Sequence, residues 1–222
     1  MIKANKQLIL KLFIGSLIFG MLFFNSFSRI KNNGSGGGYE EEDDEKVNGM
    51  NITIETYISE GGGYYLSANS DIQTILKTIE LQDIQSIDFI ELNNVLDKAI
   101  SKMRNAILTY ENLIKKAEST PYNEYVLSLL EDFDYTNFMI EKGLNNDVFK
   151  EVEEYLKEGD ITGIFKNTYN SFTDILEMLN LIKVEISKNN IPELSIFWRL
   201  NETLSESSLF GSYVARVFSA IL

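Results

Sequence analysis

The sequence predicts an all-α protein whose helices pack as an up-and-down bundle. From Ser70 onward, apolar residues recur at spacings of three and four, the period of a helix with one buried face. The breaks between these runs are short, as in bundles whose neighbouring helices are antiparallel. The 222 residues include no cysteine, so the apolar core alone must stabilise the fold. We expect about five to seven helices.

The first 28 residues have the pattern of a membrane-targeting segment. Lys3, Lys6 and Lys11 precede an apolar run over residues 12–24. That run has the length of a signal-peptide core and is short for a spanning helix. Residues 1–28 are therefore predicted to be a signal peptide or an N-terminal membrane anchor.

Two fates of this segment remain open. Cleavage after Ser28 is favoured by the small residues around it. In the alternative, the leader stays uncleaved and residues 8–24 lie in the membrane. Either way, the rest of the chain is expected to be extracytoplasmic: periplasmic, on the cell surface or secreted.

Residues 29–50 are predicted to be a flexible linker before a single domain over residues 51–222. Residues 32–38 are rich in glycine, and six adjacent acids follow at residues 40–45. Such compositions resist ordering. The acidic run lacks the alternating ligands and central glycine of an EF-hand, so we expect at most weak binding of divalent cations.

The domain is expected to begin with a short non-helical segment. Ile52 and Ile54 alternate with polar residues, glycines at 61–63 interrupt the run, and Leu66 lies in a second apolar run. Alternation of this kind is typical of strands. A small β-hairpin over residues 52–68 and an irregular segment lying on the bundle are the two expectations.

Capping signals locate the later helices. Asp88 and Glu91 form a capping box before the longest amphipathic stripe, whose apolar positions are Leu92, Leu96, Ala99, Met103, Ala106, Tyr110, Leu113 and Ala117. Pro121 ends this stripe and begins a helix that runs to about Gly143. A shorter helix starts at Asn146 or Asp147 and closes at Gly159, and Asp160 opens another long one. Two further apolar runs follow Pro192.

Charge and composition exclude many functions. The net charge is −13, and because residues 1–28 carry three lysines and no acid, the remainder carries −16. Such a chain repels nucleic acid. It has no histidine and no cysteine, which excludes catalytic triads, zinc sites and thiolate chemistry. We assign no catalytic residue, no cofactor and no metal ligand, and a non-enzymatic role is favoured.

The acid-rich helix around Glu151, Glu153, Glu154 and Glu158 is best explained as a solvated face. One segment differs in kind, because it combines backbone freedom with two adjacent amphipathic rings. It consists of Gly61, Gly62, Gly63, Tyr64 and Tyr65, and we take it as the candidate recognition segment.

Three functions are therefore weighed. The first is a non-catalytic extracytoplasmic binding or interaction module built on the bundle. The second is a small-ligand-binding protein with a pocket between its helices. The third is a carboxylate-based hydrolase. The partner, whether protein or small ligand, is not identified by the sequence.

Overall fold

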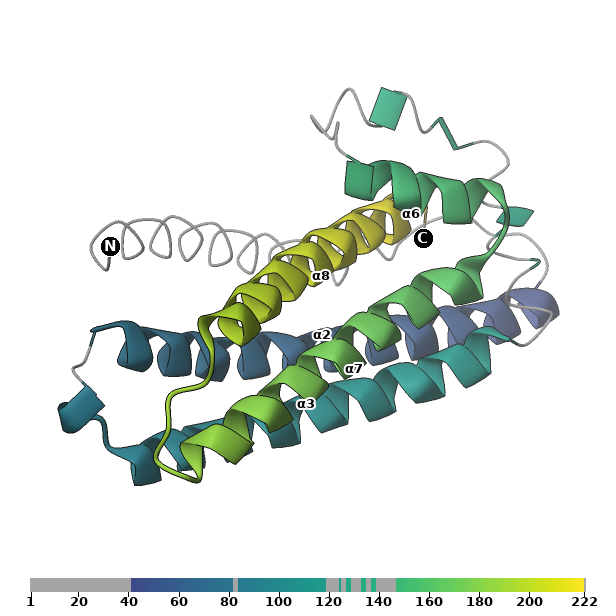
Figure 1. Cartoon of the computed structure of the whole chain (residues 1–222). Helices are drawn as coiled ribbons and strands as arrows, with labels where there is room; N and C mark the ends of the chain where they lie inside the picture. The colour runs from purple at the N-terminus through teal and green to yellow at the C-terminus, as the bar shows by residue number, and fades with distance from the viewer. Residues whose placement is uncertain are drawn as a thin grey trace.

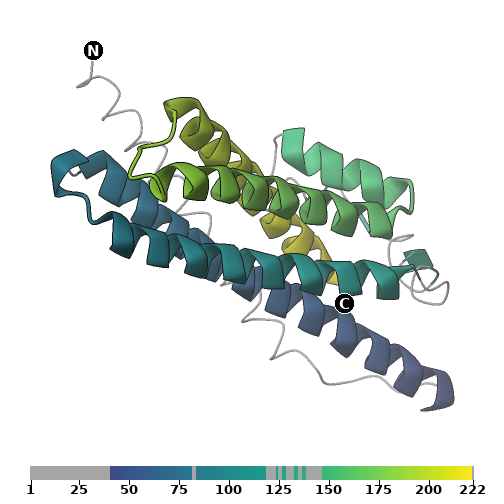
Figure 2. The same cartoon turned by 60° about the horizontal axis from the view of Figure 1, so that its bottom comes forward.

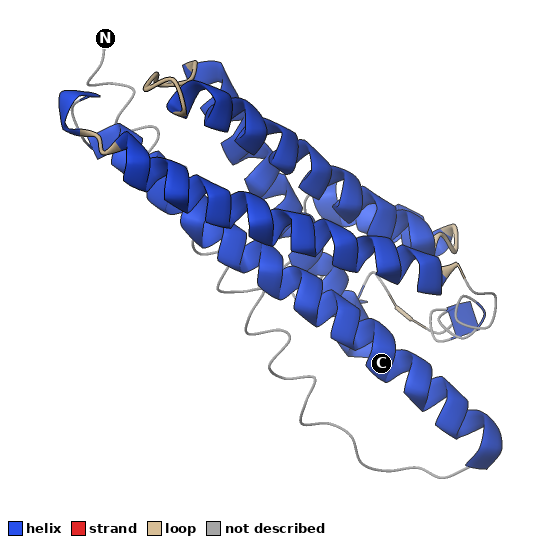
Figure 3. Ribbon diagram, turned by 90° about the horizontal axis from the view of Figure 1, so that it is seen from below, coloured by secondary structure: helices blue, strands red, loops and turns tan. Residues whose placement is uncertain are grey.

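Helices form nearly all of the computed structural model, which describes residues 41–81, 84–118 and 147–221 and a few short pieces between 124 and 138. The α-helices are α2 (Glu41–Leu81), α3 (Phe89–Ala117), α6 (Asp147–Lys157), α7 (Ile161–Ile186) and α8 (Leu194–Ile221). A short 3-10 helix, η1 (Ile84–Ser86), leads from α2 into α3. The prediction of an all-α bundle is confirmed (Figure 3).

The helices form a bundle with α2 and α8 as its first and last long members. The antiparallel pair α2 and α3 packs together, α3 also packs on α7, and α7 packs on α8. The short helix α6 lies against α7 and α8 (Figure 1). The core between them is filled by apolar side chains, among them Met103, Phe165, Phe172 and Leu179.

Capping residues begin and end the helices where the sequence predicts. The Asp88 carboxylate accepts hydrogen bonds from the backbone N–H groups of Ile90 and Glu91, each at 3.0 Å. The Asp160 carboxylate accepts one from Gly163 at 2.7 Å. Gly159 has a φ of 73°, the left-handed conformation that suits glycine after a helix. The predicted α3 stripe is buried at every position from Leu92 to Ala117.

The expectation for residues 52–68 is wrong. Neither a hairpin nor an irregular segment is present there, because α2 runs without a break from Glu41 to Leu81 (Figure 1). The stripe Ile58, Tyr65, Ala68 and Ile72 is buried, and its spacing is helical. This tertiary burial outweighs the helix-breaking tendency of three glycines, each of which costs about 0.5–1 kcal/mol in a helix interior.

The linker expectation differs from the structure over residues 41–50, which form the first turns of α2. Tyr57 lies beside Lys116 and Asp71 beside Lys102, so residue 56 lies level with the end of α3. Residues 41–55 therefore extend past α3 by about 20 Å, at a rise of about 1.5 Å per residue. Figure 2 shows this projecting end of α2.

The leader, residues 1–28, and most of the helix predicted after Pro121 lie outside the described residues. In the part of the chain that the structure describes, no helix is both long and apolar enough to cross a bilayer.

Candidate recognition site on α2

The structure divides the candidate recognition segment between core and surface. Gly61, Gly62 and Tyr65 are buried, whereas Gly63 and Tyr64 face solvent. The two adjacent tyrosines differ sharply, since Tyr64 is 40% exposed and Tyr65 only 2%. Successive residues of a helix point about 100° apart, so only one of them can join the core.

Tyr65 is a structural residue. Its ring stacks on that of Phe172 in α7, with centroids 4.8 Å apart and planes 11° from parallel. Its hydroxyl donates a hydrogen bond to the carbonyl oxygen of Leu204 at 2.9 Å and lies 2.7 Å from the Ser208 hydroxyl, both in α8. Burial raises the pKa of Tyr65 to about 12, despite the opposing hydrogen bond with Ser208.

Gly61 is required by the packing of α2 on α3. A Cβ atom at this position would lie 2.7 Å from the ring of Tyr110, closer than such contacts occur. That ring cannot easily move, because it is buried and packs edge-on against Phe172 at 5.2 Å. By contrast, a Cβ atom at Gly63 would meet nothing within 4 Å.

These two glycines are therefore predicted to respond oppositely to alanine. Gly61→Ala should lower the free energy of unfolding by about 1–3 kcal/mol, the usual effect of overpacking. Gly63→Ala should raise it by about 0.5–1 kcal/mol, because alanine favours an exposed helix. Urea denaturation of both variants measures this. A stabilised Gly61→Ala protein would contradict the close approach of α2 and α3.

The exposed Tyr64 lies on a stripe along the junction of α2 and α3. Tyr57, Tyr64 and Asp71 are seven residues apart, so they share one face of α2. Tyr57 lies beneath the Lys116 ammonium group, which is 5.8 Å from its ring centroid. Asp71 forms an ion pair with Lys102 at 2.7 Å.

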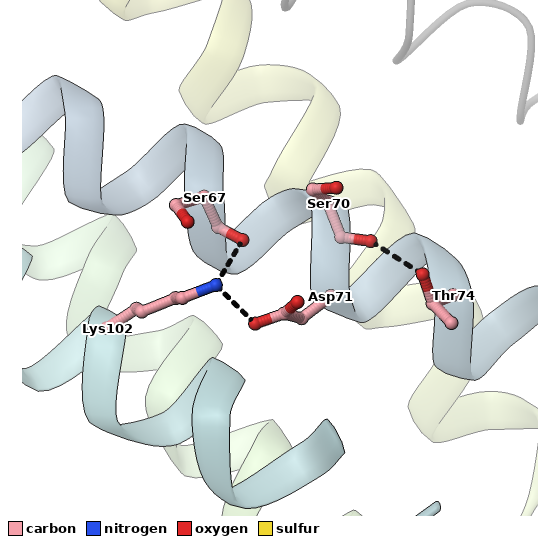
Figure 4. A network of polar contacts seen from close by, with 5 residues as sticks. All are labelled: Ser67, Ser70, Asp71, Thr74 and Lys102. Carbon is pink, nitrogen blue, oxygen red and sulfur yellow. Dashed lines mark hydrogen bonds and ion pairs between the residues drawn. The ribbon is translucent and has the colours of Figure 1, made fainter.

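Figure 4 shows how Lys102 is held. Its ammonium group donates to the Asp71 carboxylate and, at 3.4 Å, to the backbone carbonyl of Ser67. One turn further, the Thr74 hydroxyl donates to the carbonyl of Ser70 at 3.1 Å. Tyr64 thus lies between a cation–π contact and an ion pair, each about 10 Å away along α2.

This surface, Tyr57–Tyr64–Asp71 with Lys102 and Lys116, combines an exposed aromatic ring with charged groups of both signs. An exposed ring with charged contacts about 10 Å to either side along the helix can supply contact area and orienting polar groups. This surface carries one acid and two lysines, whereas the whole chain has a net charge of −13. Sequence reasoning did not find Tyr57, Asp71 or the lysines, although the seven-residue spacing of Tyr57, Tyr64 and Asp71 was available as a signal.

In the acid-rich segment around α6, Glu151, Glu154 and Glu158 are exposed and Glu153 is partly buried. Glu153 forms an ion pair with Lys157 at 2.6 Å, and Glu151 accepts a hydrogen bond from Asn167 at 2.6 Å. Among the described residues, no three acids are grouped so that they could hold a metal ion.

Comparison of the chain with protein-family models, curated proteins and solved structures finds no match to any of them.

Proposed function

We propose that the chain is a non-catalytic extracytoplasmic interaction module, in which a helical bundle displays the α2–α3 surface around Tyr64 to a partner. The observation that carries this proposal is the 40% exposure of Tyr64 in the middle of a long helix. Tyrosine supplies a large contact area at a small cost in conformational entropy. Tyr65, beside it, is already committed to the core.

The packing between the helices favours this proposal over a small-ligand pocket. The centre of the bundle near Tyr65 is occupied by the rings of Tyr65 and Tyr110, each of which packs on the ring of Phe172. Because these rings fill the interior at this point, we place the proposed binding on the surface. Leader-directed export remains part of the proposal, since the lysine-flanked apolar run precedes the bundle.

Site-specific crosslinking tests the proposed surface. A photoreactive phenylalanine analogue at position 64 should give a discrete adduct in native membranes or culture fluid, and the same analogue at Leu181 should not. Leu181 is a matched control because it is also exposed, at 55%, and lies on α7.

Competition then shows whether the adduct depends on Tyr64. An excess of unlabelled wild-type protein should suppress it, and Tyr64→Ala protein should compete at least tenfold less well. Equal competition by both proteins, or the same adducts from position 181, would reject Tyr64 as the recognition residue. Tyr64→Ala is expected to keep its melting temperature, because exposed side chains contribute within about 0.5 kcal/mol.

A further inference from the structure

The first and last long helices meet at a seam that differs from the other interfaces of the bundle. The described contact between α2 and α8 centres on Tyr65, whose hydroxyl bonds to the Leu204 carbonyl and to Ser208. Consecutive long helices α7 and α8 are joined by a short turn. By contrast, α2 and α8 are the first and last helices that the structure describes, and no short turn joins them.

The seam is also rich in polar groups. On α8, the two serines at the Tyr65 hydroxyl, Ser207 and Ser208, are buried. Burying such groups stabilises a fold far less than burying aliphatic surface does.

The other interfaces are more apolar or are tied by ion pairs. The buried face of α3 is almost entirely apolar from Leu92 to Ala117. Ion pairs join α3 or its end to α7, between Asp97 and Lys183 and between Glu118 and Lys166. On its other side, α8 is held by Phe218 against Phe165 of α7 and by Phe210 against Tyr155 of α6.

We infer that the bundle opens locally at the α2–α8 seam, and that the hydrogen bonds of the Tyr65 hydroxyl hold this seam closed. Local opening is expected where an interface has few buried apolar contacts. In the opened state, α8 separates from α2 at Tyr65, while α3 stays packed on α7 and α8 stays joined to α7 through Phe218 and Phe165. The stacked rings of Tyr65 and Phe172 then become accessible. This inference is independent of the proposed function, because Tyr64 lies outside the seam.

Thiol labelling tests the inference cleanly, because the chain has no native cysteine. Ser208→Cys places a thiol in the seam at a side chain that is 1% exposed, and it keeps the Tyr65–Leu204 hydrogen bond. Ala106→Cys places one in the α3 face, where the native side chain is fully buried. Iodoacetamide should label position 208 at least tenfold faster than position 106 in native buffer.

The effects of urea and of removing the Tyr65 hydroxyl on the labelling rates distinguish local opening from global unfolding. Labelling at 208 should change little with low urea, whereas labelling at 106 should rise steeply, because only global unfolding exposes much surface. Adding Tyr65→Phe should speed labelling at 208 by about fivefold, since one hydrogen bond contributes about 1 kcal/mol. Tyr65→Phe also lowers global stability, so the labelling rate at 106 is corrected for the free energy of unfolding of each protein. After this correction, the rate at 106 should not change.

Ser207→Cys, at the neighbouring buried serine, serves as a second probe if the Ser208→Cys protein folds poorly. Equal rates at the seam and at position 106, or seam labelling that rises with urea as steeply as global unfolding, would overturn the inference. So would seam labelling that Tyr65→Phe leaves unchanged.

Discussion

Replacing Tyr65 with alanine is expected to lower the free energy of unfolding by about 3–5 kcal/mol, as for other buried aromatic side chains. The substitution removes the ring that stacks on Phe172 and both contacts of the hydroxyl with α8. It also leaves a cavity at the point where α2, α7 and α8 meet. Equilibrium denaturation in urea, followed by circular dichroism, measures the change.

Tyr64→Ala is the matched control for this prediction, since it alters the adjacent residue of the same type. Its stability should lie within about 0.5 kcal/mol of the wild type. A loss of less than about 1 kcal/mol for Tyr65→Ala would show that Tyr65 does not pack as described. A large loss for Tyr64→Ala would instead place that ring in the core and remove it from the recognition surface.

Alkaline pH is expected to destabilise the protein partly through Tyr65. The pKa of Tyr65 is raised by burial from 10.0 to about 12. Below pH 10 the hydroxyl is protonated in both the folded and unfolded states, so it adds no pH dependence. Between pH 10 and 12 the unfolded chain releases this proton and the folded chain keeps it, and stability falls by about 1.4 kcal/mol per pH unit from this group.

Tyr65→Phe isolates that contribution. The variant should start less stable near neutral pH by about 1 kcal/mol, because it lacks the hydroxyl hydrogen bonds. Its stability should then fall less steeply above pH 10, so the two curves converge and cross. Burial also raises the pKa of Tyr110, which contributes equally to both proteins. Urea midpoints from pH 8 to 11 measure the two slopes, and parallel curves would contradict the burial of the Tyr65 hydroxyl.

Local patterns were sufficient to predict most helices after residue 87. The carboxylates of Asp88 and Asp160 cap helices that begin directly after them, and Gly159 ends α6 in a left-handed conformation. These signals are local because a helix terminus needs a hydrogen-bond acceptor or a permissive φ within a few residues. The buried stripe of α3 was equally predictable, because its period follows from helix geometry alone.

Tertiary contacts decided the structure around residues 52–68. Gly61, Gly62 and Gly63 and the alternating isoleucines before them favour a break or a strand when read locally. In the folded chain, Gly61 allows α2 to approach Tyr110, and Ile58 and Tyr65 bury on the bundle. That packing depends on partners up to 139 residues away, such as Leu204, which no local pattern contains.

The sequence by itself determined the helical class, the capping positions and the absence of histidine and thiol chemistry. The tertiary structure alone separated Tyr64 from Tyr65. The two have the same side chain and adjacent positions, and only the directions of α3, α7 and α8 around α2 decide which ring is buried. The physical reason is that a helix turns about 100° per residue, so the placement of its neighbours, rather than residue type, assigns one tyrosine to the core and the other to the surface.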